Sequence, residues 1–202
     1  MKLYAEYLER KEVTIEQSRI LQELGALLKW EYEEVFSLYL SCAQNKDYLD
    51  SAKGIEYQIV ADEDVLMCHG KRVVFKHKEL LELLAVLCDL VEEILPVGSV
   101  VVLKKEFLTK IPGIENVDQF RLVITNRFLL NNESTFHTYA GSAYPISNFN
   151  GKEVMCFSKS LIDQVVFLGF SDEQEEAYVS LMKYELIMEK GKHSAGLSAV
   201  NK

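Results

Sequence analysis

Apolar residues recur at helical spacing through the first fifty positions. Thr14-Ile15-Glu16-Gln17 has the form of a capping box. In this motif the Thr side chain accepts a hydrogen bond from the backbone N–H three residues on, and the Gln side chain reaches back. Apolar residues then follow every three or four positions, at Ile20, Leu21, Leu24, Leu27 and Leu28, and again at Tyr32, Val35, Phe36, Tyr39 and Leu40. The pattern predicts helices up to about residue 50.

The pattern becomes extended after Lys53-Gly54. Residues 55–60 have the composition of a strand, and residues 65–75 predict a β-hairpin that turns at His69-Gly70. A long helix is predicted next, over residues 77–94, with apolar residues on one face at Leu80, Leu83, Leu84, Leu87, Leu90, Val91 and Ile94. Burying seven such side chains stabilises the folded state by roughly 10–20 kcal/mol, before the loss of conformational entropy is subtracted. Leu95-Pro96 ends this helix, because the residue before proline is disfavoured in the α region.

Short extended segments dominate the second half of the chain. We predict strands at residues 100–103, 120–125, 138–143, 154–157 and 164–168, joined by loops that contain Gly, Asn, Ser and Pro. Such a series favours an antiparallel meander or a small barrel. Ser171-Asp172-Glu173-Gln174 is a second capping box, and it opens a helix that runs to about Lys190.

The predicted fold is therefore α+β: N-terminal helices and a β-hairpin, a long central helix, and then a small antiparallel meander or barrel-like sheet closed by a C-terminal helix. The expected organisation is a mainly helical lobe over residues 1–94 and a small β domain with its helix over residues 95–190. Residues 191–202 are small and polar, which predicts a flexible tail.

Charge and composition exclude some functions. The chain has 202 residues and a net charge of −9, and its basic residues come in twos, as in Lys71-Arg72. Nucleic-acid binding draws on Lys and Arg that neutralise phosphates, so we expect neither a nucleic acid nor an anionic membrane surface as partner. The N-terminus lacks the pattern of a signal peptide, and no apolar stretch reaches 18 residues. The four cysteines include no C-x-x-C pair. These features favour a cytoplasmic protein with reduced thiols.

Candidate chemistry is sparse. Cys68, His69, His77 and Cys88 are the natural metal ligands to consider, but they lack the close pairing typical of zinc sites. No G-x-S-x-G motif occurs, and no Gly-rich phosphate loop precedes a helix. We therefore expect no catalytic, cofactor-binding or metal-binding residues, no cofactor, and no enzyme activity. An unrecognised enzyme would instead require His137, Cys156 and a carboxylate to converge in a cleft.

Aromatic residues are concentrated in the predicted N-terminal helices. They are Tyr4, Tyr7, Trp30, Tyr32, Tyr39 and Tyr48. Trp and Tyr are enriched at the energetic centres of protein interfaces, although they are equally common in cores. We take Trp30, Tyr32 and Tyr39 as candidate protein-binding residues.

Four motifs follow one another in the second half of the chain. They are Leu95 to Lys104 (LPVGSVVVLK), Arg121 to Arg127 (RLVITNR), Tyr139-Ala140-Gly141 with Tyr144-Pro145, and Ile162 to Phe170 (IDQVVFLGF) followed by the acidic run from Asp172 to Glu176. With these motifs in this order, residues 95–190 resemble a small domain of unknown function found in type VII secretion loci of Gram-positive bacteria, which encode LXG-type toxins. The chain departs from the family pattern in a longer segment between Lys105 and Phe120, and in the residues after Pro145.

The resemblance implies a role beside a secreted toxin and no enzyme activity. The expected function is that of an adaptor or chaperone-like accessory protein, which binds a toxin or its small helical partners. The alternative is an immunity protein that neutralises a cognate toxin. The motifs add Arg127, Tyr139 and Tyr144 to the candidate protein-binding residues. The oligomeric state and the identity of the partner stay open.

Overall fold

The computed structural model describes residues 2–109, 119–146, 151 and 154–198. The chain divides into two compact units. Among the described residues, the N-terminal unit comprises those of 2–93 together with 187–190, and the C-terminal unit comprises those of 94–186 and 191–198. Within the described residues, every helix is too short or too polar to cross a lipid bilayer.

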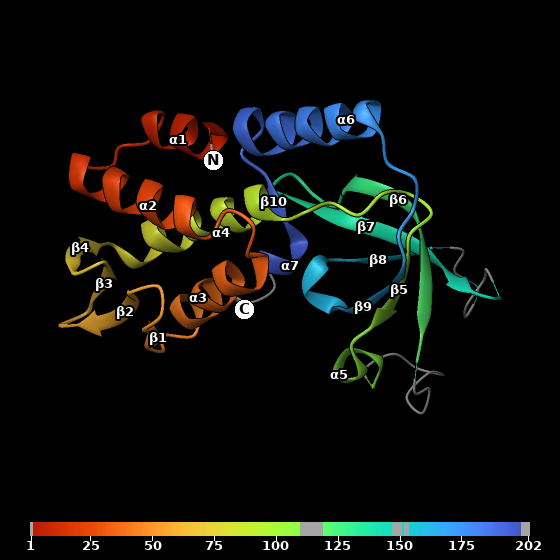
Figure 1. The fold of residues 1–202 in the computed structure, drawn as a ribbon, viewed down its shortest axis with the longest axis horizontal. Coiled ribbons are helices and arrows are strands. Elements are labelled where there is room, and N and C mark those ends of the chain that lie inside the picture. The colour runs from red at the N-terminus through yellow and green to blue at the C-terminus, as the bar shows by residue number, and fades with distance from the viewer. Residues whose placement is uncertain (1, 110–118, 147–150, 152–153, 199–202) are drawn as a thin grey trace. The chain divides into compact units, whose positions relative to one another are not determined.

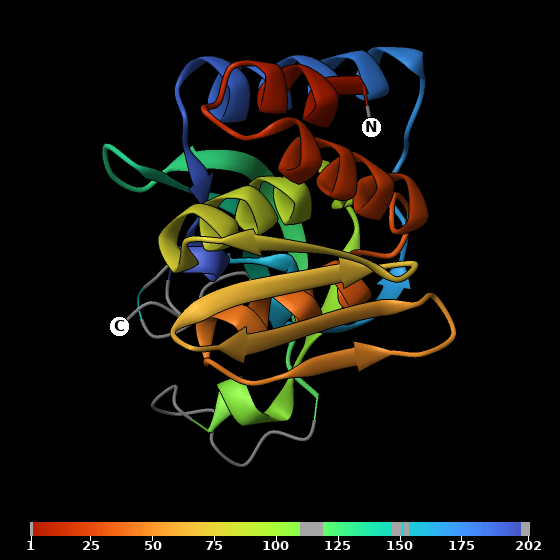
Figure 2. The same ribbon diagram turned by 90° about the vertical axis from the view of Figure 1, so that its left-hand side faces the viewer.

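The N-terminal unit combines four helices with a four-stranded antiparallel sheet. The helices are α1 (Lys2–Glu9), α2 (Ile15–Leu27), α3 (Tyr32–Ala43) and α4 (His77–Val91). The strands are β1 (Tyr48–Asp50), β2 (Ile55–Val60), β3 (Glu63–Cys68) and β4 (Lys71–Phe75), which pair in that order. Figure 2 shows the four strands side by side, and α2, α3 and α4 contact the sheet. The predicted hairpin over residues 65–75 corresponds to β3 and β4.

Local sequence signals explain how these elements begin and end. The capping box of α2 forms as predicted, because the Thr14 hydroxyl accepts from the Gln17 N–H at 3.2 Å and the Gln17 side chain accepts from the Thr14 N–H at 2.8 Å. The prediction of helix up to about residue 50 is wrong at its end. The chain leaves α3 through Asn45, whose φ of 52° lies in the left-handed region that Asn tolerates. Residues 48–50 then form β1 and pair with β2.

The C-terminal unit is built on a six-stranded sheet. Its strands are β5 (Val100–Leu103), β6 (Arg121–Leu130), β7 (Thr135–Tyr144), β8 (Met155–Phe157), β9 (Ile162–Phe167) and β10 (His193–Ser194). Its helices are α5 (Lys105–Leu108), η1 (Lys159–Leu161), α6 (Glu173–Lys183) and α7 (Ala195–Ser198). The π-helix η2 (Tyr184–Glu189) follows α6, and its residues from Ile187 on belong to the N-terminal unit. The strands of this sheet, β5 to β10, and helix α6 are labelled in Figure 1.

The sheet is open, so the barrel-like alternative is wrong, while the predicted α+β class is confirmed. The strand order is β10-β7-β6-β5-β9, with β8 also paired to β7. The long pair β6 and β7 forms the centre, and β10 is the one strand of this order that pairs in parallel. The core of the unit is apolar and includes Leu95, Val101, Leu103, Leu108, Phe120, Leu122, Ile124, Tyr139, Ala143, Phe157 and Ile162.

Two further expectations for the C-terminal unit need correction. The helix cap of α6 is Asp172, not Ser171, because the Asp172 carboxylate accepts from the Glu175 N–H at 3.0 Å. The segment from Gly191 was predicted to be a flexible tail, but residues 193–198 form β10 and α7. Leu197 is buried there, which gives this small polar segment an apolar contact. Residues 199–202, and most of the segment between Lys105 and Phe120, lie outside the described residues.

Candidate protein-binding site

Strand β9 lies at an edge of the C-terminal sheet. Among the described strands it pairs with β5 alone, in an antiparallel register that joins Val101 to Val165 and Leu103 to Ile162. Irregularities interrupt the pairing at two points, between Val100 and Val101 and again between Val102 and Leu103. An edge strand offers backbone N–H and C=O groups to another chain, and bulges are common at such positions.

The side chains on and after this strand form an exposed apolar surface. Only Ile162 of β9 is buried, and the five residues after it are exposed. Phe167 is 60% exposed and Phe170 is 82% exposed. We call this region the β9 surface, and it consists of Val97, Val165, Val166, Phe167, Leu168 and Phe170. Successive side chains of a strand point to opposite faces, so Val165 and Phe167 share one face and Val166 lies on the other. Exposed apolar residues on both faces of an edge strand are typical of a segment that a partner covers.

A close backbone approach holds the end of the β9 surface against the start of β5. The Gly169 N–H donates to the Ser99 hydroxyl at 3.0 Å. A Cβ added at Gly169 would lie 2.4 Å from the Val97 carbonyl oxygen, which is a steric overlap with backbone. Only glycine permits this approach without a shift of the chain. The first and last motifs of the family resemblance therefore meet at this point.

Acidic residues follow the β9 surface in the sequence. Helix α6 starts three residues after Gly169 with Asp172 as its cap, and Glu173, Glu175 and Glu176 occupy its first turn. Carboxylates are favourable at this end of a helix, because its backbone N–H groups point toward them. Glu175 is engaged within the unit by Arg127 of β6. The combination of an apolar edge strand and an acidic helix start fits a partner that is apolar and basic.

The structure buries most of the protein-binding residues that the sequence suggested. Tyr32 and Tyr39 are 8% and 1% exposed, and Tyr139 is wholly buried. The Arg127 side chain is 5% exposed. These four side chains are occupied within their own units, so assigning them to a docking surface is a misreading of core residues. Trp30 and Tyr144 are exposed, at 81% and 54%, and remain candidates.

Each of the three buried tyrosines has a structural role. Tyr39 and Tyr32 flank Phe36 in a stacked series along α3. The Tyr139 hydroxyl accepts from the Leu95 N–H at 3.2 Å, and the Tyr139 ring stacks on Phe157. These contacts explain why aromatic residues occur at these positions of the core.

Sequence reasoning identified β9 as a strand but missed its surface. Val165-Val166-Phe167-Leu168 is a continuous apolar run, which is typical of a strand buried on both faces. The neighbouring acidic run from Asp172 to Glu176 was the one available signal that the segment borders solvent. Whether this strand is buried or exposed depends on its place in the strand order of the sheet, and no local sequence pattern encodes that order.

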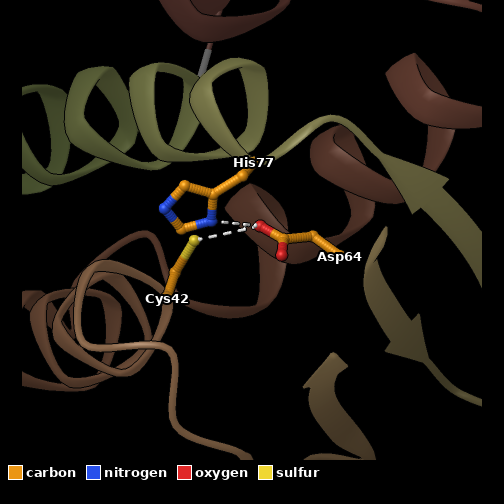
Figure 3. A group of neighbouring side chains, drawn as sticks. All are labelled: Cys42, Asp64 and His77. Carbon is orange, nitrogen blue, oxygen red and sulfur yellow. Dashed lines mark hydrogen bonds and ion pairs between the residues drawn. The ribbon is translucent and has the colours of Figure 1, made fainter. Parts of the chain in front are cut away.

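A second cluster lies in the N-terminal unit, where Cys42 of α3, Asp64 of β3 and His77 of α4 converge (Figure 3). The Cys42 thiol lies 3.5 Å from Asp64 Oδ2, and His77 Nδ1 lies 2.9 Å from the same oxygen. The Tyr57 hydroxyl donates to the other carboxylate oxygen, Oδ1, at 3.1 Å. Cys42, Tyr57 and Asp64 are buried, while the His77 side chain is 38% exposed.

The cluster does not have the geometry of an activated cysteine. Burial first, and then the Asp64 carboxylate, raises the pKa of the Cys42 thiol to about 12, so the thiol is protonated at neutral pH. A cysteine nucleophile needs a lowered pKa and access to substrate, and Cys42 is wholly buried. Burial also raises the pKa of Tyr57. Among the described residues, His137 and Cys156 belong to no comparable group of potential ligands.

The metal candidates considered from the sequence are not brought together either. In the part of the chain that the structure describes, His77 joins Cys42 and Asp64, and Cys68, His69 and Cys88 are not members of the group. Cys42 and Asp64 were missed because neither lies near His77 in the sequence. The positions are separated by 22 residues from Cys42 to Asp64 and by 13 from Asp64 to His77.

Comparison with known proteins gives one match. No curated protein and no solved structure matches the chain. A family model matches residues 94–178, which contain β5 to β9 and the first half of α6. The model is that of DUF4176, described as a domain of unknown function, and this stretch of the chain is similar to it.

Proposed function

We propose that this protein is a non-enzymatic, cytoplasmic accessory protein of a type VII secretion locus. In this proposal it acts as an adaptor or chaperone-like factor, and it binds a secreted toxin or one of the small helical partners of that toxin. The β9 surface of the C-terminal unit is the binding site.

The observation that carries the proposal is the exposure of β9 and the residues after it. Val166, Phe167 and Phe170 would each gain from burial, because apolar surface removed from water contributes roughly 25 cal/mol per Å². Exposed edge strands are usually shortened, charged or covered, since they otherwise pair with other chains. A partner segment that covers β9 would bury these side chains and satisfy the outer edge of the strand.

The charge of the chain supports a partner with basic residues beside its apolar segment. The net charge is −9, and the first turn of α6 adds carboxylates next to the β9 surface. Complementary charge across an interface accelerates encounter and discriminates between partners. An export chaperone needs both properties, because it meets its toxin in competition with other cytoplasmic proteins.

The family match supports the resemblance from which the secretion role is inferred. It covers residues 94–178, which contain all four motifs of the resemblance, including the acidic run after the last one. Every residue of the β9 surface lies within this stretch, since the surface extends from Val97 to Phe170. The link to type VII secretion rests on the resemblance and is part of the proposal.

The test is affinity capture with the tagged full-length chain from its source cells, followed by mass spectrometry. We compare the wild type with a Phe167→Lys, Phe170→Lys double variant. Both positions are exposed, so the double variant is expected to fold, which circular dichroism checks. Leu130→Lys is the matched control, because Leu130 is 62% exposed in the same unit but lies outside the β9 surface.

The adaptor proposal expects the export domain of a toxin, or small helical secretion proteins, with the wild type and the Leu130→Lys control. It expects their loss with the double variant. Capture of a toxin through its C-terminal catalytic domain would favour the immunity alternative. Recovery of the chain alone across a range of salt concentrations would contradict both functions, and self-association through β9 would replace them.

A further inference from the structure

The Cys42, Asp64 and His77 cluster is independent of the β9 surface. It lies wholly within the N-terminal unit, and its three residues come from three different elements. Cys42 belongs to the last turn of α3, Asp64 is the second residue of β3, and His77 is the first residue of α4. A group that holds these three side chains together would tie both helices to the sheet.

The three side chains offer the donor atoms that zinc prefers. Thiolate sulfur, imidazole nitrogen and carboxylate oxygen are its common protein ligands. Sulfur and imidazole together select a transition metal of the zinc class over Mg²⁺ or Ca²⁺, which prefer oxygen alone. Three protein ligands leave a fourth coordination position for water, as in open zinc sites, whereas closed structural sites usually have four protein ligands.

The distances in the cluster are close to those of a tetrahedral site. Zinc–ligand bonds of about 2.0–2.3 Å place oxygen and nitrogen ligands about 3.3 Å apart, and sulfur and oxygen ligands about 3.6 Å apart. Here Asp64 Oδ2 lies 2.9 Å from His77 Nδ1 and 3.5 Å from Cys42 Sγ. All three donor atoms lie within 4.8 Å of one another. The two distances to Asp64 Oδ2 would change by a few tenths of an ångström to admit an ion, and the distance between Cys42 Sγ and His77 Nδ1 would become about 3.6 Å.

The surroundings supply a supporting contact and an entry path. The Tyr57 hydroxyl holds Asp64 Oδ1, which leaves Oδ2 directed at the other two residues. Outer partners of this kind orient metal ligands. The His77 side chain is 38% exposed, so an ion can reach the cluster from solvent.

The same residues also form a hydrogen-bonded cluster without an ion, so metal binding has to be measured directly. The Cys42 thiol and the Tyr57 hydroxyl both donate to the buried Asp64 carboxylate, and His77 pairs with it. A buried carboxylate needs such partners to offset its desolvation. The hydrogen-bonded cluster and a metal site therefore use the same residues and differ in whether Cys42 Sγ and His77 Nδ1 carry protons.

We propose that Cys42 Sγ, Asp64 Oδ2 and His77 Nδ1 bind one divalent transition-metal ion of the zinc class, with Tyr57 holding the other carboxylate oxygen. On binding, the Cys42 thiol releases its proton to solvent and the thiolate binds the ion, while the imidazole proton of His77 moves from Nδ1 to Nε2 through solvent so that Nδ1 can bind the ion. The ion acts as a structural link between α3, β3 and α4, and no catalytic role follows from the geometry.

The test is a titration of the reduced, metal-free full-length protein with Co²⁺ and then Zn²⁺. A thiolate ligand gives bound Co²⁺ a charge-transfer absorption band, and this band disappears when Zn²⁺ displaces the Co²⁺. We expect one ion per chain and a melting temperature that rises with Zn²⁺. His77→Gln is expected to fold, because His77 is partly exposed, and to bind at least tenfold more weakly. Tyr57→Phe is expected to weaken binding by about 10–100-fold, as for other outer partners of metal ligands.

Matched controls separate this site from adventitious binding. Cys156→Ser removes the exposed thiol of the chain, and His69→Gln removes a histidine outside the cluster. Both variants should bind Co²⁺ and Zn²⁺ as the wild type does. The proposal is overturned if the reduced wild type takes up neither ion, if His77→Gln binds like the wild type, or if either control abolishes binding. If a Cys42→Ala variant, which removes the sulfur ligand, fails to fold, metal binding by His77→Gln still tests the proposal.

Discussion

Single buried side chains in this protein are held by partners on other elements, and Arg127 is the clearest case. Its guanidinium forms a bidentate pair with the Glu175 carboxylate, and one of the two contacts measures 3.0 Å. It also lies 5.3 Å from the centre of the Tyr178 ring. The pair joins β6 to α6 within the C-terminal unit. Arg suits this position because its planar fork matches a carboxylate, which Lys does not.

We predict that Arg127→Ala lowers the free energy of unfolding by about 2 kcal/mol, in line with hydrogen bonds to charged groups. Urea denaturation measures this loss. Arg121→Ala on the same strand is the control, because the Arg121 guanidinium makes an exposed contact with Gln119 and should matter less. Equal effects of the two variants would show that the ion pair adds no stability of its own.

At the scale of elements, side-chain caps fix where helices begin. The Thr14 box of α2 was readable from the sequence, whereas the start of α6 was misplaced by one residue. Ser171 and Asp172 are both good cap residues, and each has a suitable residue three positions later, Gln174 and Glu175. Asp172 takes the role because its backbone is extended and its carboxylate reaches the Glu175 N–H.

The position of this cap gives a prediction. Asp172→Ala should lower the free energy of unfolding by about 1 kcal/mol, since it leaves a helix N–H without its acceptor. Ser171→Ala, one residue earlier and also exposed, should have little effect. Chemical denaturation of both variants distinguishes the two assignments. A larger loss for Ser171→Ala would place the cap where the sequence suggested.

At the scale of the whole molecule, the end of the described chain contributes to the C-terminal unit. Strand β10 pairs with β7, at His193 with Thr135 and at Ser194 with Phe136. The Lys192 ammonium donates to the Asn132 carbonyl at 3.1 Å. Leu197 of α7 is 2% exposed. A segment of this composition gains its order from these tertiary contacts.

Leu197→Ala is therefore expected to destabilise the protein by about 2–5 kcal/mol, as for other buried leucines. Thermal and urea unfolding measure the change. Leu168→Ala provides the contrast, because Leu168 is 58% exposed on the β9 surface and its truncation should cost far less. If the two variants are equally stable, the segment after Gly191 behaves as the flexible tail that its composition suggests.

The sequence by itself determined the α+β class, the hairpin of β3 and β4, the cap of α2 and the approximate positions of β5 to β9. These features follow from local physics. Apolar residues repeat with the period of a helix or a strand, and capping groups lie within three residues of the N–H they satisfy. It also suggested a protein-binding role, but it placed that role partly on residues such as Tyr39 and Tyr139 that turn out to be core.

Only the tertiary structure decided which surfaces and clusters exist. The apolar run at Val165 reads as a buried strand until strand order places β9 at an edge. Cys42, Asp64 and His77 become neighbours only when α3, β3 and α4 pack together. In both cases the deciding contacts join residues far apart in the sequence. Their positions are set by how strands and helices pack, and local periodicity carries no information about that packing.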